Sequence, residues 1–206
     1  MKRYWLGIII LLATVLGTWI AYPYLPDRIP THWNFEGVPD QFGPKSFGVF
    51  ILPGTMVFLY LLMMFLPRID PKKVNFQKFN YIGITNGILF FFFLFQAMVI
   101  TSSLGLVNSK NTIPVLVGLL FIFIGNLSPK FKPNYFLGIR TPWTLANEDV
   151  WKKTHRFGGK VLVIAGILML LVPIAPAAIQ AYGVITILMA SLVLIVVASY
   201  YYFIKL

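Results

Sequence analysis

The dominant pattern in the chain is an alternation of long apolar stretches with shorter polar segments. The apolar stretches cover residues 4–22, 47–66, 81–107, 113–128, 161–179 and 183–204. A helix needs about 20 apolar residues to cross roughly 30 Å of hydrocarbon. The pattern therefore predicts an all-α membrane protein with six transmembrane helices, forming one integral membrane domain over residues 1–206.

The composition agrees with a membrane protein. The chain is 58% hydrophobic and 11% charged, and its mean hydropathy is +0.80. A soluble domain carries about 25% charged residues, so this chain has too little polar surface for water to be its only solvent. The sequence contains no Cys, which excludes disulfides and thiolate catalysis.

Lys and Arg fall almost entirely in alternate polar segments. Fourteen of the 17 occupy the first, third, fifth and seventh segments: Lys2, Arg3; Arg68, Lys72, Lys73, Lys78; Lys130, Lys132, Arg140, Lys152, Lys153, Arg156, Lys160; and Lys205. Loops rich in Lys and Arg stay in the cytoplasm, so both chain ends are predicted to lie inside the cell. Because these residues flank apolar spans, we attribute the net charge of +11 to topology and expect no direct nucleic-acid binding.

The loop between the first two spans, residues 23–46, holds five prolines and two glycines. Such a segment is predicted to form an ordered, irregular, Pro-rich outer cap rather than a helix. A metal site of His32, Glu36 and Asp40 is one hypothesis, since imidazole and carboxylates suit zinc. We prefer the simpler interpretation, in which His32 and Asp40 bond to backbone groups of a tight turn and Trp33 rests at the lipid interface.

The inner loop, residues 129–160, is expected to carry a short amphipathic helix over residues 145–157, capped by Thr144 and lying in the membrane interface. Spacings of three and four place Glu148, Trp151 and His155 on one face of it. Arg140 precedes this helix in a turn, and an ion pair with Glu148 or a bond to helix-end carbonyls is its expected role.

Catalysis has little support in the sequence. His155 and Glu148 could act as base and orienting group, but no nucleophile or metal-ligand set stands beside them. We therefore expect no catalytic residues and no cofactor. The spans hold no charged residue or His well inside them, and their polar residues are expected to bond between helices or to nearby carbonyls: Asn86, Gln96, Asn126 and Ser191.

Two motifs carry a family resemblance. The outer one reads LPxxIPTHWNxxGxxD over residues 25–40, and the inner one reads NYFLGIRTPWT over residues 134–144, continued by ExxWxxTHR over residues 148–156. With these motifs the chain resembles the SdpI family, the bacterial membrane immunity proteins for sporulation-delaying protein toxin. The outer motif resembles a front domain of unknown function at about residues 1–66, and the inner motif an SdpI-like region at about residues 81–206.

The resemblance implies a multi-pass protein of the bacterial plasma membrane that protects its cell from a secreted antimicrobial peptide toxin of the SdpC type. It also implies signalling, in which the immunity protein holds a cytoplasmic transcriptional repressor at the membrane. The expected partners are therefore membrane lipids, the toxin on the outer side and a repressor inside. Expected toxin contacts are Ile29, Pro30, His32, Trp33 and Asp40; expected residues for repressor docking are Asn134, Gly138, Arg140, Thr141, Trp143, Glu148, Trp151 and His155.

Two other functions stay open from the sequence. A membrane-embedded metal-dependent hydrolase would lose activity with a chelator or with His155→Ala. A small-solute transporter would show flux in vesicles that depends on Asn86, Gln96 or Asn126.

Overall fold

Six long helices form the body of the molecule. The computed structural model describes residues 2–73, 75 and 80–206, so Lys78 of the charge pattern lies outside the described residues. The helices are α1 (Lys2–Ala21), α2 (Lys45–Ile69), α3 (Tyr81–Ser103), α4 (Ser109–Leu127), α6 (Glu148–Leu171) and α7 (Ala177–Ile204). Within the described ranges, six helices are long and apolar enough to cross a membrane, which confirms the six-span prediction.

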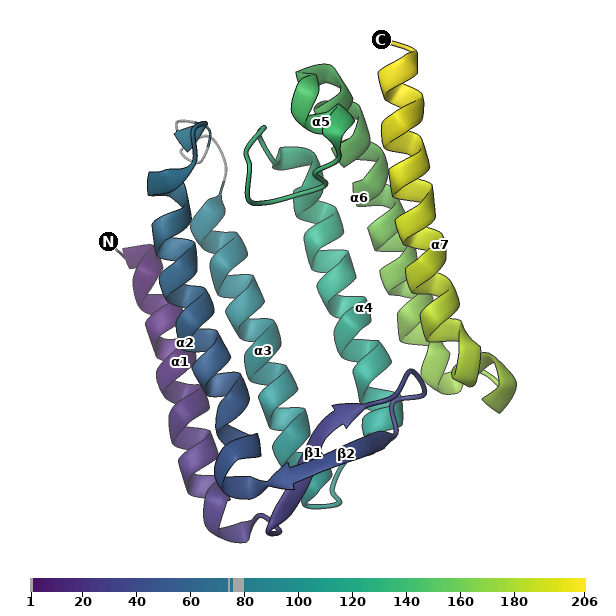
Figure 1. Cartoon of the computed structure of the whole chain (residues 1–206). Helices are drawn as coiled ribbons and strands as arrows, with labels where there is room; N and C mark the ends of the chain where they lie inside the picture. Colours follow the sequence, from purple (N-terminus) through teal and green to yellow (C-terminus); the bar gives the residue numbers. More distant parts are fainter. Residues whose placement is uncertain (1, 74, 76–79) are drawn as a thin grey trace.

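The helices form two groups of three. Helices α1, α2 and α3 lie together on one side of the bundle, α4, α6 and α7 lie on the other, and α3 faces α4 where the groups meet (Figure 1). A two-stranded hairpin covers one end of the bundle, which we call the hairpin end. The short helix α5 (Pro142–Ala146) and both chain termini lie toward the opposite end, which we call the loop end (Figure 1).

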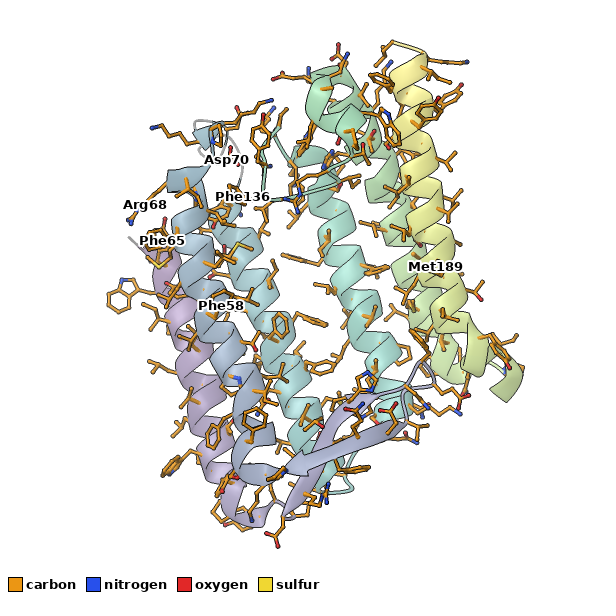
Figure 2. The ribbon with its side chains drawn as sticks, viewed as in Figure 1. Phe58, Phe65, Arg68, Asp70, Phe136 and Met189 are labelled. Carbon is orange, nitrogen blue, oxygen red and sulfur yellow. The ribbon has the colours of Figure 1, made fainter. Side chains whose placement is uncertain are left out.

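The outside of the bundle is apolar, as lipid contact requires. Exposed side chains along it include Phe58, Phe65 and Met189, with 64%, 57% and 53% of their surface accessible (Figure 2). Inside the bundle, glycines allow α4 and α6 to approach closely. A Cβ atom added at Gly166 would lie 2.6 Å from the carbonyl oxygen of Gly118, so the two backbones are in direct contact.

The segment predicted as an irregular outer loop is a β-hairpin. Strand β1 (Arg28–Trp33) pairs antiparallel with β2 (Pro39–Pro44), after the 3-10 turn η1 (Tyr22–Tyr24). The prolines do not prevent pairing, because both strands of a two-stranded sheet are edge strands, where Pro is tolerated. At the turn the Asn34 side-chain oxygen accepts hydrogen bonds from the backbone of Glu36 and Val38, both at 3.0 Å. The cap is therefore a hairpin, with shifts of register in β1 between Pro30 and Trp33.

The predicted separate helix over residues 145–157 is wrong. The structure has the one-turn helix α5, a break at Asn147, and then α6 running unbroken to Leu171. Asn147 caps α6 by accepting from the backbone N–H of Asp149 (2.8 Å) and Val150 (3.3 Å). Thr144 is not a cap residue either: Thr141 caps α5, and Thr144 completes its capping box.

Helix α6 begins thirteen residues earlier than the predicted fifth span, so its basic first turns belong to the same continuous helix as the apolar span. It also ends earlier, at Leu171, where the 3-10 turn η4 (Val172–Ile174) with Pro173 follows. The third span likewise stops at Ser103 rather than at residue 107, because Gly105 turns the chain with a φ of 72°. The connection between α4 and α6, residues 128–147, is called the signature loop below; it opens with the 3-10 turn η3 (Ser128–Lys130).

Candidate functional site

Asn134 organises the first half of the signature loop. Its side chain is 1% exposed. Its oxygen accepts hydrogen bonds from the backbone N–H of Phe136 (2.9 Å) and Leu137 (2.6 Å). Its amide nitrogen donates to the carbonyls of Lys132 (2.9 Å) and Leu137 (3.0 Å). This buried side chain thus supplies hydrogen bonds to backbone groups that have no helix or strand partner in an irregular loop.

His155 on α6 holds the second half of the loop. Its Nε2 accepts a hydrogen bond from the backbone N–H of Ile139 at 2.9 Å, and its Nδ1 donates to the Trp151 carbonyl at 2.9 Å. Since the carbonyl can only accept, the imidazole is neutral with its proton on Nδ1. Both ring nitrogens are therefore occupied, and neither is free to act as a base or metal ligand in this arrangement.

Gly138 is required where the loop passes over His155. Its φ is 105°, and an added Cβ would lie 2.4 Å from His155 Nε2. Any side chain here would displace the imidazole that binds Ile139. In the GIR sequence of the inner motif, Gly138 therefore leaves room for the imidazole of His155, which binds the backbone of Ile139 sixteen residues earlier.

Trp151 completes the buried support of the loop. Its ring stacks on His155 with 4.1 Å between ring centroids, and its Nε1 donates to the Phe131 carbonyl at 2.9 Å. Neither Trp151 nor His155 is accessible, with exposures of 0% and 1%. Glu148, expected to share a face with them, is exposed at the start of α6.

Arg140 does not pair with Glu148. Its guanidinium donates to the carbonyl of Tyr135 within the same loop. Among the described residues, Arg140 and Glu148 form no ion pair. Both remain exposed, while Trp143 is partly buried with its ring 5.1 Å from that of Tyr200 on α7. Of the eight inner residues proposed from the sequence, Arg140, Glu148 and Gly138 are the exposed ones.

Asp70, a residue that the sequence analysis passed over, connects the two helix groups at the loop end. It is 2% exposed, and its carboxylate accepts from the backbone N–H of Lys72 (2.6 Å) and Tyr135 (2.8 Å). Figure 2 shows Asp70 at the end of α2, close to the loop that carries Phe136. Nearby, the side chain of Asn75 donates to the Pro133 carbonyl at 2.6 Å. The available signal was a single acid directly after the second span, among basic neighbours.

At the hairpin end, His32 and Asp40 pair across the two strands. His32 Nδ1 lies 2.6 Å from Asp40 Oδ1, and the side chains are 57% and 41% exposed. The expected bonds to backbone groups are thus replaced by a side-chain pair. In the described part of the chain, no three His, Cys, Asp or Glu side chains are close enough to share a metal ion. Glu36, the third proposed ligand, lies in the turn between the two strands. The spacing of four residues would bring the three side chains together on a helix, but it does not do so in a hairpin.

The other proposed toxin contacts are mostly inside the fold. Ile29 is 0% exposed and packs in a cluster with Val49, Met98 and Leu116, and Pro30 is also buried. Trp33 is partly buried, with its ring edge-on to Phe95 at 5.8 Å. These residues fasten the hairpin to the helices.

Three apolar side chains on the hairpin are exposed, and the sequence analysis did not single them out. Phe35 and Val38 lie at the turn, with exposures of 64% and 42%, and Phe42 lies on strand β2 opposite Pro30, with an exposure of 49%. Together with His32 and Asp40 they form what we call the hairpin surface.

The hairpin is also tied to α4. Ser109 Oγ donates to the Gly37 carbonyl at 2.9 Å. Gly37 has a φ of 74°, and a Cβ there would lie 2.8 Å from the Cα of Lys110. The tip of the hairpin therefore has a fixed position over the second helix group.

Polar residues within the spans bond to other helices or to their own. The Gln96 amide nitrogen donates to Thr18 Oγ1 of α1 (3.0 Å) and to the Val49 carbonyl of α2 (2.9 Å), joining three helices. Asn126 donates to the Ile122 carbonyl at 2.8 Å, and Ser191 to the Ile187 carbonyl at 2.6 Å. For these three the predicted structural role is confirmed.

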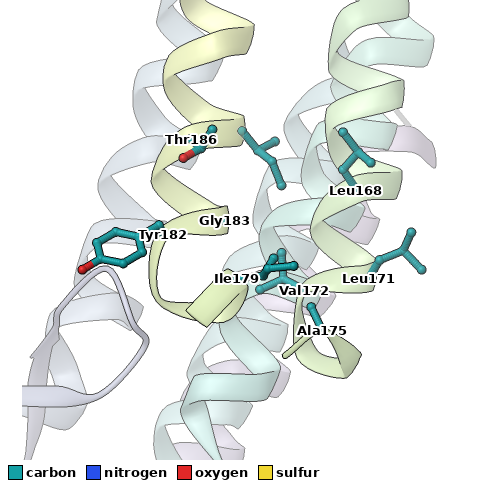
Figure 3. Close-up of a pocket in the computed structure, with 9 residues that line it drawn as sticks. Leu168, Leu171, Val172, Ala175, Ile179, Tyr182, Gly183 and Thr186 are labelled. Carbon is teal, nitrogen blue, oxygen red and sulfur yellow. The ribbon is translucent and has the colours of Figure 1, made fainter. Parts of the chain in front are cut away.

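An apolar cavity lies between α6 and α7 at the hairpin end. It measures about 470 Å³ and is lined by side chains that include Leu168, Val172, Ile179 and Tyr182 (Figure 3). Among the described residues that line it, none is charged, and the polar ones are Tyr182 and Thr186.

The comparisons with known proteins cover both ends of the molecule. The model of the SdpI/YfhL protein family matches residues 130–203, and that of a domain of unknown function, DUF1648, matches residues 8–57. The chain is 32% identical over 207 residues to "Immunity protein SdpI" of Bacillus subtilis (strain 168), covering 100% of this chain and 98% of that protein. No solved structure matches. With full-length similarity to one member and six spanning helices, the chain belongs to the SdpI family and is a multi-pass protein of the bacterial cell membrane.

Proposed function

We propose that the protein is a membrane immunity protein that protects its cell from a secreted peptide toxin. The observation that carries this proposal is the full-length similarity to a protein named for immunity, which includes both the hairpin and the signature loop. The proposal extends to orientation: the hairpin end faces the exterior and the loop end faces the cytoplasm.

The charge distribution supports this orientation. The loop end carries Lys and Arg in the α2–α3 connection, in the signature loop and on the first turns of α6. Of the basic residues that the structure describes, Arg28, Lys45 and Lys110 lie at the hairpin end, and Lys45 Nζ is 3.4 Å from Asp27 Oδ1. Cytoplasmic loops carry the excess of basic residues, so the hairpin is assigned to the outside.

The hairpin surface is the proposed site of toxin contact. It presents three exposed apolar side chains beside the His32–Asp40 pair. Apolar side chains gathered on an exposed, ordered element are typical of a binding surface for an amphipathic peptide. Ile29, Pro30 and Trp33 then act by holding this surface in place instead of by touching the toxin.

A survival assay tests the proposal directly. The unchanged chain and the double variant Phe35→Ser/Phe42→Ser are each expressed in a toxin-sensitive strain. The toxin concentration that halves growth is then measured for both. We expect at least about a tenfold loss of protection, which corresponds to about 1.4 kcal/mol of lost binding. The control is Leu106→Ser, which removes another side chain, 71% exposed, from the connection between α3 and α4. Full protection by the double variant, at equal membrane levels, would contradict the assignment of the hairpin surface.

A second proposed role, repressor docking, belongs to the exposed part of the loop end. Arg140 and Glu148 are exposed there, and Trp143 is partly accessible. The buried residues Asn134, Trp151 and His155 keep this surface in shape. Arg140→Gln/Glu148→Gln should keep toxin protection but remove toxin-dependent expression of a reporter placed behind the host operon promoter. Unchanged induction of the reporter would argue against this docking surface.

A further inference from the structure

A groove between α4 and α6 opens at the loop end of the bundle. It has a volume of about 420 Å³. Its floor exists because Gly125 and Gly159 face each other without side chains: a Cβ added at either would lie 2.7 Å from the other's carbonyl oxygen. Asn126 and Pro129 form one edge of the groove. The helices therefore touch at the glycines and leave a hollow beside the contact.

Two basic side chains lie at the groove, and neither has a partner among the residues that the structure describes. Arg156 and Lys160 both line it, are both exposed, and are one turn apart on α6. Among the described residues, neither side chain makes a hydrogen bond or an ion pair; the lysines in ion pairs are Lys45 and Lys152. Like charges four residues apart repel one another on a helix, so an anion between them would be stabilised by both.

The chemistry of the groove changes along the helix. The two cations are followed, one turn deeper into α6, by the apolar lining residues Val163 and Ile164, and Ile164 is 59% exposed. A charged entrance with an apolar continuation fits a molecule that has an anionic head and a hydrocarbon tail. A free inorganic anion would use the first part only.

We propose that this groove is a binding site for an anionic phospholipid. The phosphate lies between Arg156 and Lys160, and an acyl chain runs over Val163 and Ile164. Basic pockets between membrane helices are a known way of holding anionic lipid head groups. The proposal does not depend on the immunity function or on the membrane orientation, since it concerns only the end of the bundle at which these residues lie.

Native mass spectrometry of the purified full-length chain tests the site. Phosphatidylglycerol and phosphatidylcholine with identical acyl chains are titrated separately into the detergent-solubilised protein. We expect phosphatidylglycerol to bind about tenfold more tightly, and Arg156→Gln/Lys160→Gln to remove that preference. Because both side chains are exposed, the double variant should keep its circular dichroism spectrum and thermal midpoint in detergent. The charge-preserving variant Arg156→Lys/Lys160→Arg should keep the preference.

The matched control is Lys132→Gln/Lys153→Gln, which removes the same charge from two exposed lysines at the loop end that do not line the groove. An equal loss of preference in this control would show only general attraction to the basic surface and would overturn the proposal. So would equal binding of the two lipids by the unchanged protein, or complete displacement of phosphatidylglycerol by millimolar inorganic phosphate.

Discussion

At the scale of single residues, the signature loop depends on contacts between groups far apart in the chain. The backbone of Ile139 is bound by His155, and the backbone of Tyr135 by Asp70. Each of these hydrogen bonds satisfies a backbone donor that no strand or helix would otherwise pair. The loop is therefore held from two directions, by α6 and by the end of α2.

Gly138→Ala should destabilise the protein at one of these points. The position combines a φ of 105° with a Cβ that would lie 2.4 Å from His155 Nε2, so the substitution introduces both backbone strain and a clash. We expect a loss of about 2 kcal/mol, seen as a lower thermal midpoint in detergent.

The matched control for this substitution is Gly105→Ala. Gly105 also has a positive φ, 72°, but nothing lies within 4 Å of its added Cβ. It should therefore show the backbone penalty alone, at about 1 kcal/mol. Equal effects at the two glycines would mean that the His155 contact adds nothing.

Sequence reasoning selected residues of the inner motif without finding the partner of each one. It selected Arg140 and His155 from a dense motif, and expected Arg140 to bind either Glu148 or the carbonyls at a helix end. The structure gives Arg140 a backbone carbonyl of its own loop. Sequence reasoning missed Asp70, because its carboxylate accepts a hydrogen bond from the backbone N–H of Tyr135, which is 65 residues later in the chain. Contacts of this range have no local pattern to reveal them.

At the scale of elements, the hydrophobic pattern predicted the six membrane-spanning helices. It did not predict the start of α6, which is set by a helix cap. All six spans were found because each needs a long apolar run. The start of α6 was misplaced because its first turns are polar, and the bond that begins the helix is a local cap at Asn147. The hairpin was missed because its prolines, which count against a central strand, are tolerated in a two-stranded ribbon.

The contact between α4 and α6 gives a prediction at this scale. Gly166→Leu would place a Cβ 2.6 Å from the Gly118 carbonyl oxygen and force the helices apart. We expect a loss of about 3 kcal/mol, measured as a lower thermal midpoint in detergent. Gly17→Leu on α1 is the matched control, since nothing lies within 4 Å of its added Cβ, and it should be neutral or slightly stabilising. A neutral result at Gly166 would show that the close approach is not needed.

At the scale of the whole molecule, the two ends differ in the chemistry of their surfaces. The hairpin end presents exposed apolar side chains on an element fixed to α4, while the loop end presents basic residues around a tightly hydrogen-bonded loop. In the proposed function, the hairpin end contacts the toxin outside the cell and the loop end binds the repressor inside it. The account therefore depends on which end faces out.

Cysteine labelling in intact cells measures this most directly, because the chain has no cysteine of its own to interfere. Gln41→Cys lies on strand β2 of the hairpin, and Asn147→Cys lies between α5 and α6; both positions are exposed. A membrane-impermeant maleimide should label the cysteine at position 41 in intact cells and the one at position 147 only after the cells are opened. Labelling at 147 with protection at 41 would reverse the orientation and contradict both proposed contact surfaces.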